Sequence, residues 1–143
     1  MIGFTIARDL YHEHVKEALV KDGWSITHDP YYLDIDDRSP MEIDLGAEKL
    51  LCAERGTDKI LVEVKSFLNR SLVYDFHRAY GQFRIYRRGV LKTAPEMVLF
   101  MAMPEDVFIE IQSRPFYMEL ISEEDIKILI FNPLTKNIVT WIP

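Results

Sequence analysis

The stretch Lys59-Ile60-Leu61-Val62-Glu63-Val64-Lys65 decides the fold, because its apolar and charged residues alternate with a period of two. In a β-strand, positions 60, 62 and 64 lie on one face and positions 61, 63 and 65 on the other. Glu63 and Lys65 therefore lie on the same face, about 7 Å apart along the strand. The pattern predicts a strand with one fully apolar face and one face that carries two opposite charges.

The residues before this strand predict the other half of a β-hairpin. Ile43-Asp44-Leu45-Gly46 has strand character, and a turn is expected near Arg55-Gly56-Thr57-Asp58. The intervening segment from Ala47 to Glu54 has a composition that suits a helix, but its position between two strands favours a continued strand. This hairpin allows Asp44 to lie across from Glu63 and Lys65.

Asp44, Glu63 and Lys65 together suggest metal-assisted hydrolysis of a phosphodiester. Carboxylate oxygens suit a hard divalent ion, so Mg²⁺ or Mn²⁺ is expected, with Asp44 and Glu63 as its ligands. The ion would polarise the phosphate and activate water, and the lysine would stabilise the attacking hydroxide or the developing charge. A structural explanation is also open, since a charged outer strand face is commonly just solvated surface.

Length and composition indicate one globular domain. The chain has 143 residues, of which 48% are hydrophobic and 28% charged. The longest apolar run, Met97–Met103, is too short to cross a membrane, and the N-terminus lacks the pattern of a secretion signal. Cys52 is the only cysteine, so no internal disulfide can form. A cytoplasmic protein without a membrane partner is expected.

The charge is unevenly distributed along the chain. The segment from Lys65 to Lys92 holds seven basic residues and one acidic residue, so its net charge is +6. The whole chain has a net charge of −6, so the remaining residues together carry −12. One basic face on an acidic protein is expected where a DNA backbone binds. The arginines at 84, 87 and 88 equally suit the end of a helix, where they would complement its dipole.

Two long helices are expected, and each carries an apolar stripe. The first helix is expected from Arg8 to Lys21, and its stripe consists of Tyr11, Val15, Ala18 and Leu19. The second is expected from Ser71 to Arg88, and its stripe consists of Phe76, Ala79, Tyr80 and Phe83. His12 and Gln82 fall at the edges of these stripes, so both are expected to approach the carboxylates. His12 and His14 point about 200° apart on a helix and cannot share a zinc ion.

The remaining chain adds further α/β structure. A first strand is expected at Trp24–His28 and a central strand at Glu96–Met103, followed by short helices at Val107–Gln112 and Phe116–Ile121. Two more strands are expected at Ile126–Phe131 and Ile138–Ile142. The order helix, three strands, helix, strand and an α/β tail predicts one domain with a mixed central sheet.

This order, with an aspartate on the second strand and Glu63-Val64-Lys65 on the third, resembles the PD-(D/E)xK nucleases. The resemblance implies a restriction-endonuclease-like αβββαβ core spanning residues 1–143. Ile43 stands where the motif often has proline, and Gln82-x-x-x-Tyr86 is similar to an element of the RecB-like branch. His12 occupies the position at which resolvase-like members carry a glutamate, so the resemblance implies catalytic roles for both His12 and Gln82.

Longer blocks resemble the XisH family, the fdxN element excision controlling factors: Lys21-Asp22-Gly23-Trp24, Ile43–Leu50, Glu63–Phe67, Gly81-Gln82-Phe83 and Val139-x-Trp141-Ile142. This resemblance implies a role in programmed DNA excision with a protein partner of the XisI type. Three hypotheses remain open: a metal-dependent DNA endonuclease, a non-catalytic regulatory module that binds DNA or a protein partner, and a hydrolase of another phosphate ester. The sequence does not decide whether the chain forms a homodimer.

Overall fold

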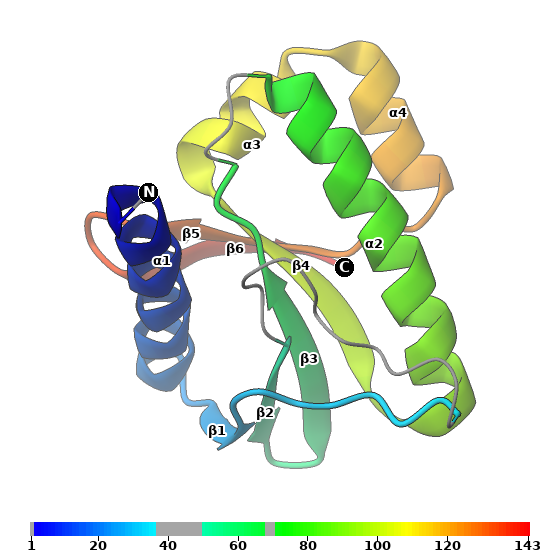
Figure 1. The fold of residues 1–143 in the computed structure, drawn as a ribbon. Coiled ribbons are helices and arrows are strands. Elements are labelled where there is room, and N and C mark those ends of the chain that lie inside the picture. Colours follow the sequence, from blue (N-terminus) through cyan, green and yellow to red (C-terminus); the bar gives the residue numbers. More distant parts are fainter. Residues whose placement is uncertain (1, 37–49, 68–70) are drawn as a thin grey trace.

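A computed structural model describes residues 2–36, 50–67 and 71–143, with helices and strands in the expected order (Figure 1). The elements are α1 (Ile2–Lys21), β1 (Ser25–His28), β2 (Leu50–Arg55), β3 (Asp58–Val64), α2 (Leu72–Thr93), β4 (Val98–Pro104), α3 (Glu105–Gln112), α4 (Pro115–Glu123), β5 (Ile128–Asn132) and β6 (Asn137–Ile142). The prediction of a mixed α/β fold is therefore confirmed.

The strands form one six-stranded sheet in the order β1-β2-β3-β4-β5-β6. Both β1–β2 and β2–β3 are antiparallel, β3, β4 and β5 are mutually parallel, and β6 returns antiparallel to β5. Parallel neighbours need long crossover connections, which α2 supplies between β3 and β4, and α3 with α4 between β4 and β5. The mixed central sheet expected from the sequence is thus present.

The β2–β3 hairpin has the expected turn. Arg55 pairs with Asp58 across it, and Gly56 has a φ of 61°, a backbone conformation that favours glycine. This tight turn determines the register of the hairpin, in which Leu50 is the residue opposite Glu63. The predicted strand character of Ala47–Glu54 is confirmed from Leu50 onward, and Ile43–Gly46 lies outside the described residues.

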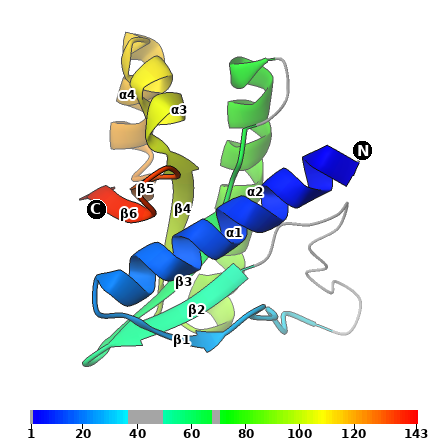
Figure 2. The ribbon, with the colours of Figure 1, turned by 90° about the vertical axis from the view of Figure 1, so that its left-hand side faces the viewer.

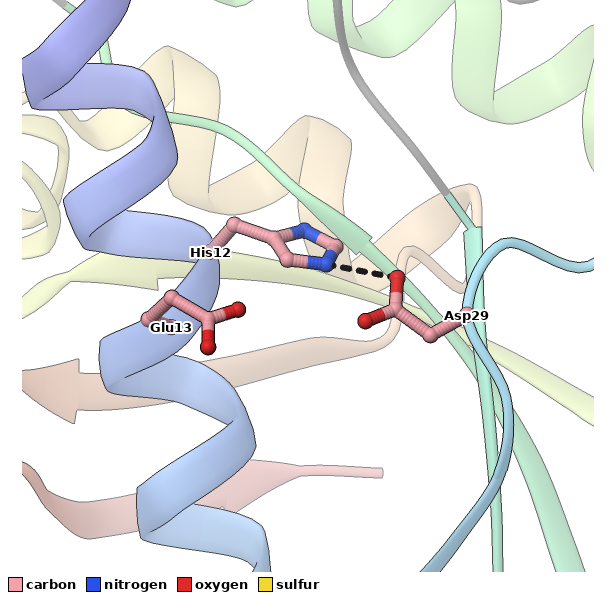
Figure 3. A group of neighbouring side chains, drawn as sticks. All are labelled: His12, Glu13 and Asp29. Atoms are coloured by element: carbon pink, nitrogen blue, oxygen red, sulfur yellow. Dashed lines mark hydrogen bonds and ion pairs between the residues drawn. The ribbon is translucent and has the colours of Figure 1, made fainter.

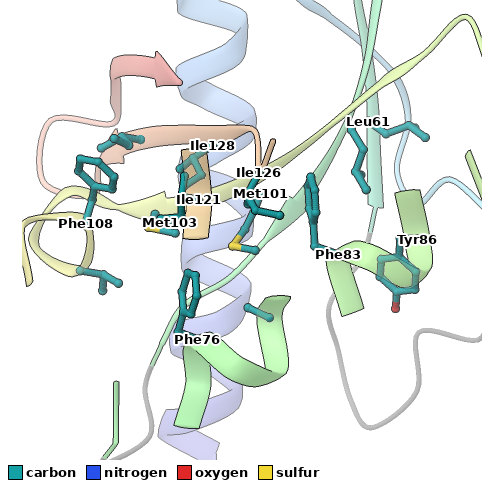
Figure 4. Packing of buried hydrophobic residues seen from close by; sticks show 14 of the residues in the cluster. Leu61, Phe76, Phe83, Tyr86, Met101, Met103, Phe108, Ile121, Ile126 and Ile128 are labelled. Atoms are coloured by element: carbon teal, nitrogen blue, oxygen red, sulfur yellow. The ribbon is translucent and has the colours of Figure 1, made fainter. Parts of the chain in front are cut away.

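The alternation of β3 separates two hydrophobic cores on opposite faces of the sheet. On one face, Val15 and Leu19 of α1 pack with apolar residues of the sheet, including Ile60, Val62 and Val64. On the other face lie residues of α2 and the sheet, including Phe76, Phe83, Leu61 and Met101 (Figure 4). Figure 2 shows α1 in front of the sheet and α2 behind it. The two long helices therefore cover opposite faces.

The two long helices are longer than the sequence predicts. The other elements lie within two residues of their expected bounds, except that the start predicted for the strand containing β2 falls outside the described residues. α1 begins at Ile2 instead of Arg8, and α2 continues to Thr93 instead of Arg88, because Gly89 and Val90 are still buried. Ser71 caps α2: its hydroxyl accepts a hydrogen bond of 3.0 Å from the Tyr74 amide. None of the described helices is both long enough and apolar enough to cross a membrane.

Candidate functional site: a buried ion pair at the end of strand β3, joined by a glutamine of helix α2

Glu63 and Lys65 form a buried ion pair at the end of β3. Their side chains are 1% and 7% exposed, and Lys65 Nζ lies 3.3 Å from Glu63 Oε1. The Lys65 amide donates to the Ala102 carbonyl of β4 at 2.9 Å, which extends the parallel ladder one residue beyond β3. Burial of two charges is tolerated because each neutralises the other. The expected placement of these two residues on one face is confirmed.

Gln82 joins this pair from α2. Lys65 Nζ donates a hydrogen bond to Gln82 Oε1, and the Gln82 side chain is half-buried. Asp75 and Tyr86 lie on the same row of α2, at i−7 and i+4 from Gln82, and are 8% and 6% exposed. That row therefore faces the packed side of the helix, as its spacing predicts. Asp75 is a buried acid that the sequence reasoning did not assign to the site. Its position in the same helical row as Gln82 was the signal that could have identified it.

Asp44 lies outside the described residues, so its predicted role as a metal ligand stays a prediction. Leu50, not Asp44, is the residue directly opposite Glu63 on β2. The two-residue turn at Gly56 and Thr57 causes this register, because it brings residues 50–55 beside β3. Glu63 is an acidic residue of the described chain that accompanies Lys65 and Gln82.

The expectation that His12 and Gln82 both approach the carboxylates of Asp44 and Glu63 stays a prediction, since Asp44 lies outside the described residues. In the described structure Gln82 contacts Lys65, whereas His12 contacts Asp29.

The Nε2 atom of His12 is 2.8 Å from Oδ1 of Asp29, which follows β1 (Figure 3). Lys16 Nζ is 2.7 Å from the other carboxylate oxygen of Asp29. The reason is architectural: α1 packs on the sheet face opposite the one that α2 covers, so its edge residues meet the end of β1.

His12, Glu13 and Asp29 each offer a ligand atom within 4.8 Å of the others. Lys16 Nζ already contacts both acids, at 2.7 Å from Asp29 and 3.5 Å from Glu13. The Lys16 ammonium therefore occupies the place that a metal ion would take between these carboxylates. The sequence reasoning did not pair Asp29 with His12, because the contact joins residues seventeen positions apart in sequence. The cluster fastens the middle of α1 to the end of β1.

The pKa of Asp29 is lowered from its usual range. Burial acts to raise it, but hydrogen bonds and charge interactions with Lys16 and His12 outweigh this effect. When the pKa of a carboxyl is lower in the folded protein than in the unfolded chain, the group stabilises the fold at pH values above the unfolded-state pKa. This stabilisation is lost as the pH falls through the folded-state pKa. The stabilisation from Asp29 is therefore complete at neutral pH and is lost below about pH 4.

Asp29→Asn is accordingly expected to lower the free energy of unfolding by about 1 kcal/mol at pH 7, because the partly exposed ion pairs are weakened by solvent. Urea titrations of both proteins at pH 7 and at pH 3 check this, and the difference should shrink at the lower pH. Asp58→Asn, which changes an exposed aspartate without an ion pair in the described structure, serves as the control. An equal loss at both pH values would contradict the role given to the Asp29 charge.

Two arginines of the basic segment contact the protein itself. Arg84 lies 3.6 Å from a carboxylate oxygen of Glu124, and Arg87 donates to the carbonyl oxygens of Glu124 and Asp125 at 3.1 and 2.7 Å. These contacts tie α2 to the end of α4. Because α2 continues to Thr93, Arg84 and Arg87 lie before its last turn, and contacts with the end of α4 account for them in place of the helix dipole. The expected DNA contact stays a prediction.

The comparisons with known proteins agree on one family. The family model described as XisH protein matches residues 5–139. A crystal structure of a fdxN element excision controlling factor protein from Anabaena variabilis is 39% identical, with a TM-score of 0.86, over 95% of this chain and 100% of that one. An XisH family protein from Nostoc punctiforme is 38% identical, with a TM-score of 0.85, over 94% and 99%. No curated protein matches. From the family match and these similarities in sequence and structure, the chain belongs to the XisH family.

Proposed function

We propose that this protein acts in programmed DNA element excision as a metal-dependent endonuclease of the PD-(D/E)xK type. The observation that carries this proposal is the buried cluster of Glu63, Lys65 and Gln82, in which strand and helix present a carboxylate, an ammonium and an amide together. The similarity to the fdxN element excision controlling factor protein from Anabaena variabilis supports the link to excision. The restriction-endonuclease-like core is part of the same proposal.

The donor atoms fit a hard divalent ion in part. Glu63 offers carboxylate oxygens, which suit Mg²⁺ or Mn²⁺, and Asp44 would provide the second carboxylate. When bound, such an ion would polarise a phosphate oxygen and make its bound water more acidic. Lys65 would stabilise charge on the phosphate or the attacking hydroxide. Gln82 would act as a positioning residue, because its amide oxygen accepts from the ammonium of Lys65 and thereby orients it.

The second candidate is a non-catalytic regulatory module that binds a XisI-type partner or a recombinase complex. The same cluster favours it, since Lys65 already neutralises Glu63 at 3.3 Å and both side chains are more than nine-tenths buried. Their mutual attraction offsets part of the cost of burying both charges without a metal ion. The replacement of the expected first-helix acid by His12, which bonds to Asp29, points in the same direction.

Cleavage of supercoiled plasmid DNA with Mg²⁺ or Mn²⁺ tests the first candidate. Gln82→Ala is expected to lower the cleavage rate by roughly 100-fold, as for loss of one preorganised polar group, while Mn²⁺ affinity stays unchanged. Glu63→Gln is expected to lose both cleavage and Mn²⁺ binding, because it removes the charged ligand. Calorimetry measures the metal affinity, and His28→Ala, an exposed residue after the β1 bulge, is the matched control.

The outcomes separate the two candidates. Cleavage that resists Gln82→Ala removes Gln82 from the site. A folded wild-type protein that fails to cleave with either ion removes the nuclease assignment, and the regulatory module then takes its place.

A further inference from the structure

A pocket of about 330 Å³ lies on the sheet face that α1 covers, beside the C-terminal end of that helix. α1 ends close to the β2–β3 turn (Figure 2), where Arg55 donates a hydrogen bond of 2.8 Å to the Asp22 carbonyl. Val98, at the start of β4, lines the pocket and is 39% exposed, so α1 leaves this part of the sheet uncovered. Ligand pockets of proteins typically measure roughly 300–1,000 Å³, so this one has room for one small ligand.

Three aromatic rings line the pocket. The ring centroids of Trp24 and Trp141 are 5.8 Å apart, and Phe100 meets Trp141 at 4.9 Å and nearly at a right angle, 77°. Edge-to-face packing of this kind favours a fixed arrangement of the rings. Trp141 is only half-buried, so the pocket presents an indole surface on which a planar ring can stack.

A guanidinium group extends this aromatic surface. Arg55 Cζ lies 4.6 Å from the centroid of the Trp24 ring, and Arg55 Nη1 also donates to a carboxylate oxygen of Asp22 at 3.2 Å. These contacts hold the plane of Arg55 against the indole. Nucleobases stack both on aromatic side chains and on arginine planes, so the pocket is preorganised for a flat ring.

The rim of the pocket combines hydrogen-bond donors with acceptors. Thr57 and Lys59 offer donors, and the carboxylates of Asp58 and Glu96 accept. All four residues are exposed, and none of the three charged ones forms an ion pair within the part of the chain that the structure describes. Both signs of charge are therefore available to a ligand.

This combination of rings and polar groups selects the class of ligand. A hydrocarbon would remove the polar groups of the rim from water without giving them partners. A simple anion would face the two carboxylates, and a simple cation would face Arg55 and Lys59. The ring of a tyrosine or tryptophan side chain from a partner protein carries only one polar group. A nucleobase matches, because it has two π-faces and an edge with both donors and acceptors.

We propose that this pocket binds a nucleobase, either of a free nucleotide or of an unpaired nucleotide in DNA. The base stacks on Trp141 and on the plane of Arg55. Its amino group donates to Asp58 or Glu96, and the ammonium of Lys59 contacts the phosphate. Adenine, cytosine and guanine carry an exocyclic amino group, whereas thymine and uracil present carbonyl oxygens that carboxylates repel. The pocket therefore favours bases with an amino group.

The pocket is separate from the Glu63–Lys65–Gln82 cluster. Ile60, which lines the pocket, precedes Lys65 by five residues, or roughly 17 Å along the strand. Ile60 also packs on the opposite face of β3 from Glu63. Binding of a base therefore requires neither the metal ion nor the cleavage proposed above, and it is measured without divalent ions.

Quenching of intrinsic fluorescence tests the proposal, because Trp24 and Trp141 are the two tryptophans of the chain and both line the pocket. Adenosine monophosphate is expected to quench the wild-type protein saturably. In calorimetry it should bind at least roughly tenfold more tightly than uridine monophosphate, as for one good contact between an amino group and a carboxylate. Single-stranded deoxyadenylate, alone and paired with deoxythymidylate, distinguishes the two sources. Tighter binding of the single strand than of the monophosphate assigns the site to unpaired DNA; otherwise the site belongs to free nucleotides.

Two variants remove the two kinds of contact separately. Asp58→Ala/Glu96→Ala should lose the preference for adenosine monophosphate, because it removes both acceptors, whereas Arg55→Lys should weaken both nucleotides by roughly tenfold, because it removes a plane for stacking. All three side chains are exposed, and circular dichroism checks that the variants are folded. Glu119→Ala/Glu123→Ala, which removes two exposed carboxylates from α4, is the matched control and should bind like wild type.

Four results would overturn the proposal: no saturable binding of any probe to wild type, equal affinity for the two monophosphates, either pocket variant binding like wild type, or quenching by the duplex, whose bases are not free to stack.

Discussion

Lys65→Met is expected to lower the free energy of unfolding at pH 7 by about 3–5 kcal/mol, one of the largest effects of a single substitution in this protein. The substitution keeps an unbranched side chain of similar length but removes the ammonium that lies 3.3 Å from Glu63. The Glu63 side chain is 1% exposed, so water cannot replace that charge. Urea unfolding followed by circular dichroism measures the loss.

The matched control removes both charges. Glu63→Leu/Lys65→Met is expected to be close to wild type in stability, because a buried ion pair is frequently replaceable by apolar residues of similar volume. The loss in Lys65→Met alone should also shrink as the pH is lowered, since protonation of Glu63 removes the buried charge. If the double variant is as unstable as the single one, packing around Lys65 and not charge pairing explains the effect.

This pair of variants also separates stability from function. A folded double variant that no longer cleaves DNA would assign the loss of cleavage to the chemistry of the cluster. Gln82→Ala complements it, because Gln82 is half-buried and contributes less to the core than Lys65 does.

Phe83→Ala is expected to lower the free energy of unfolding by about 3–5 kcal/mol through the cavity that it leaves. Phe83 is completely buried on the inner face of α2, where Figure 4 shows it beside Leu61 and Met101. The lost ring would weaken the contact of α2 with the sheet and hence the position of the adjacent Gln82.

Ile85→Ala provides the control for Phe83→Ala on the same helix. Ile85 is 58% exposed, so its truncation is expected to change the unfolding free energy by less than about 0.5 kcal/mol. Denaturant titrations of both variants measure the contrast. Similar losses at positions 83 and 85 would contradict the assignment of the buried face of α2.

Sequence patterns with a short repeat predicted the elements of this fold well. The alternation of positions 60–65 gave the two faces of β3, and the stripes of α1 and α2 identified Val15, Leu19, Phe76 and Phe83 as core residues. These patterns are reliable because a strand or helix repeats its geometry every few residues, whatever the rest of the chain does. The start of α1 and the end of α2 were less predictable. At α2, tertiary burial of Gly89 and Val90 extends the helix beyond its strongest stripe.

The candidate site was predictable only in part. Glu63 and Lys65 share a face because of local geometry, and the spacing of α2 placed Gln82 on the packed side, where it meets Lys65. The partner of His12 could not be found in this way. Asp29 is a loop residue with no periodic pattern, and its contact with His12 depends on where α1 crosses the sheet.

By itself, the sequence determined the order of the elements, the hairpin turn at Gly56, the two-faced character of β3 and the stripes of the long helices. Only the tertiary structure decided that α1 and α2 cover opposite faces of the sheet, that Leu50 lies opposite Glu63, and that both tryptophans line one pocket. The physical reason is the range of the interactions. Local backbone geometry and side-chain periodicity act within a few residues, whereas the packing of helices on a sheet depends on contacts between segments far apart in the chain.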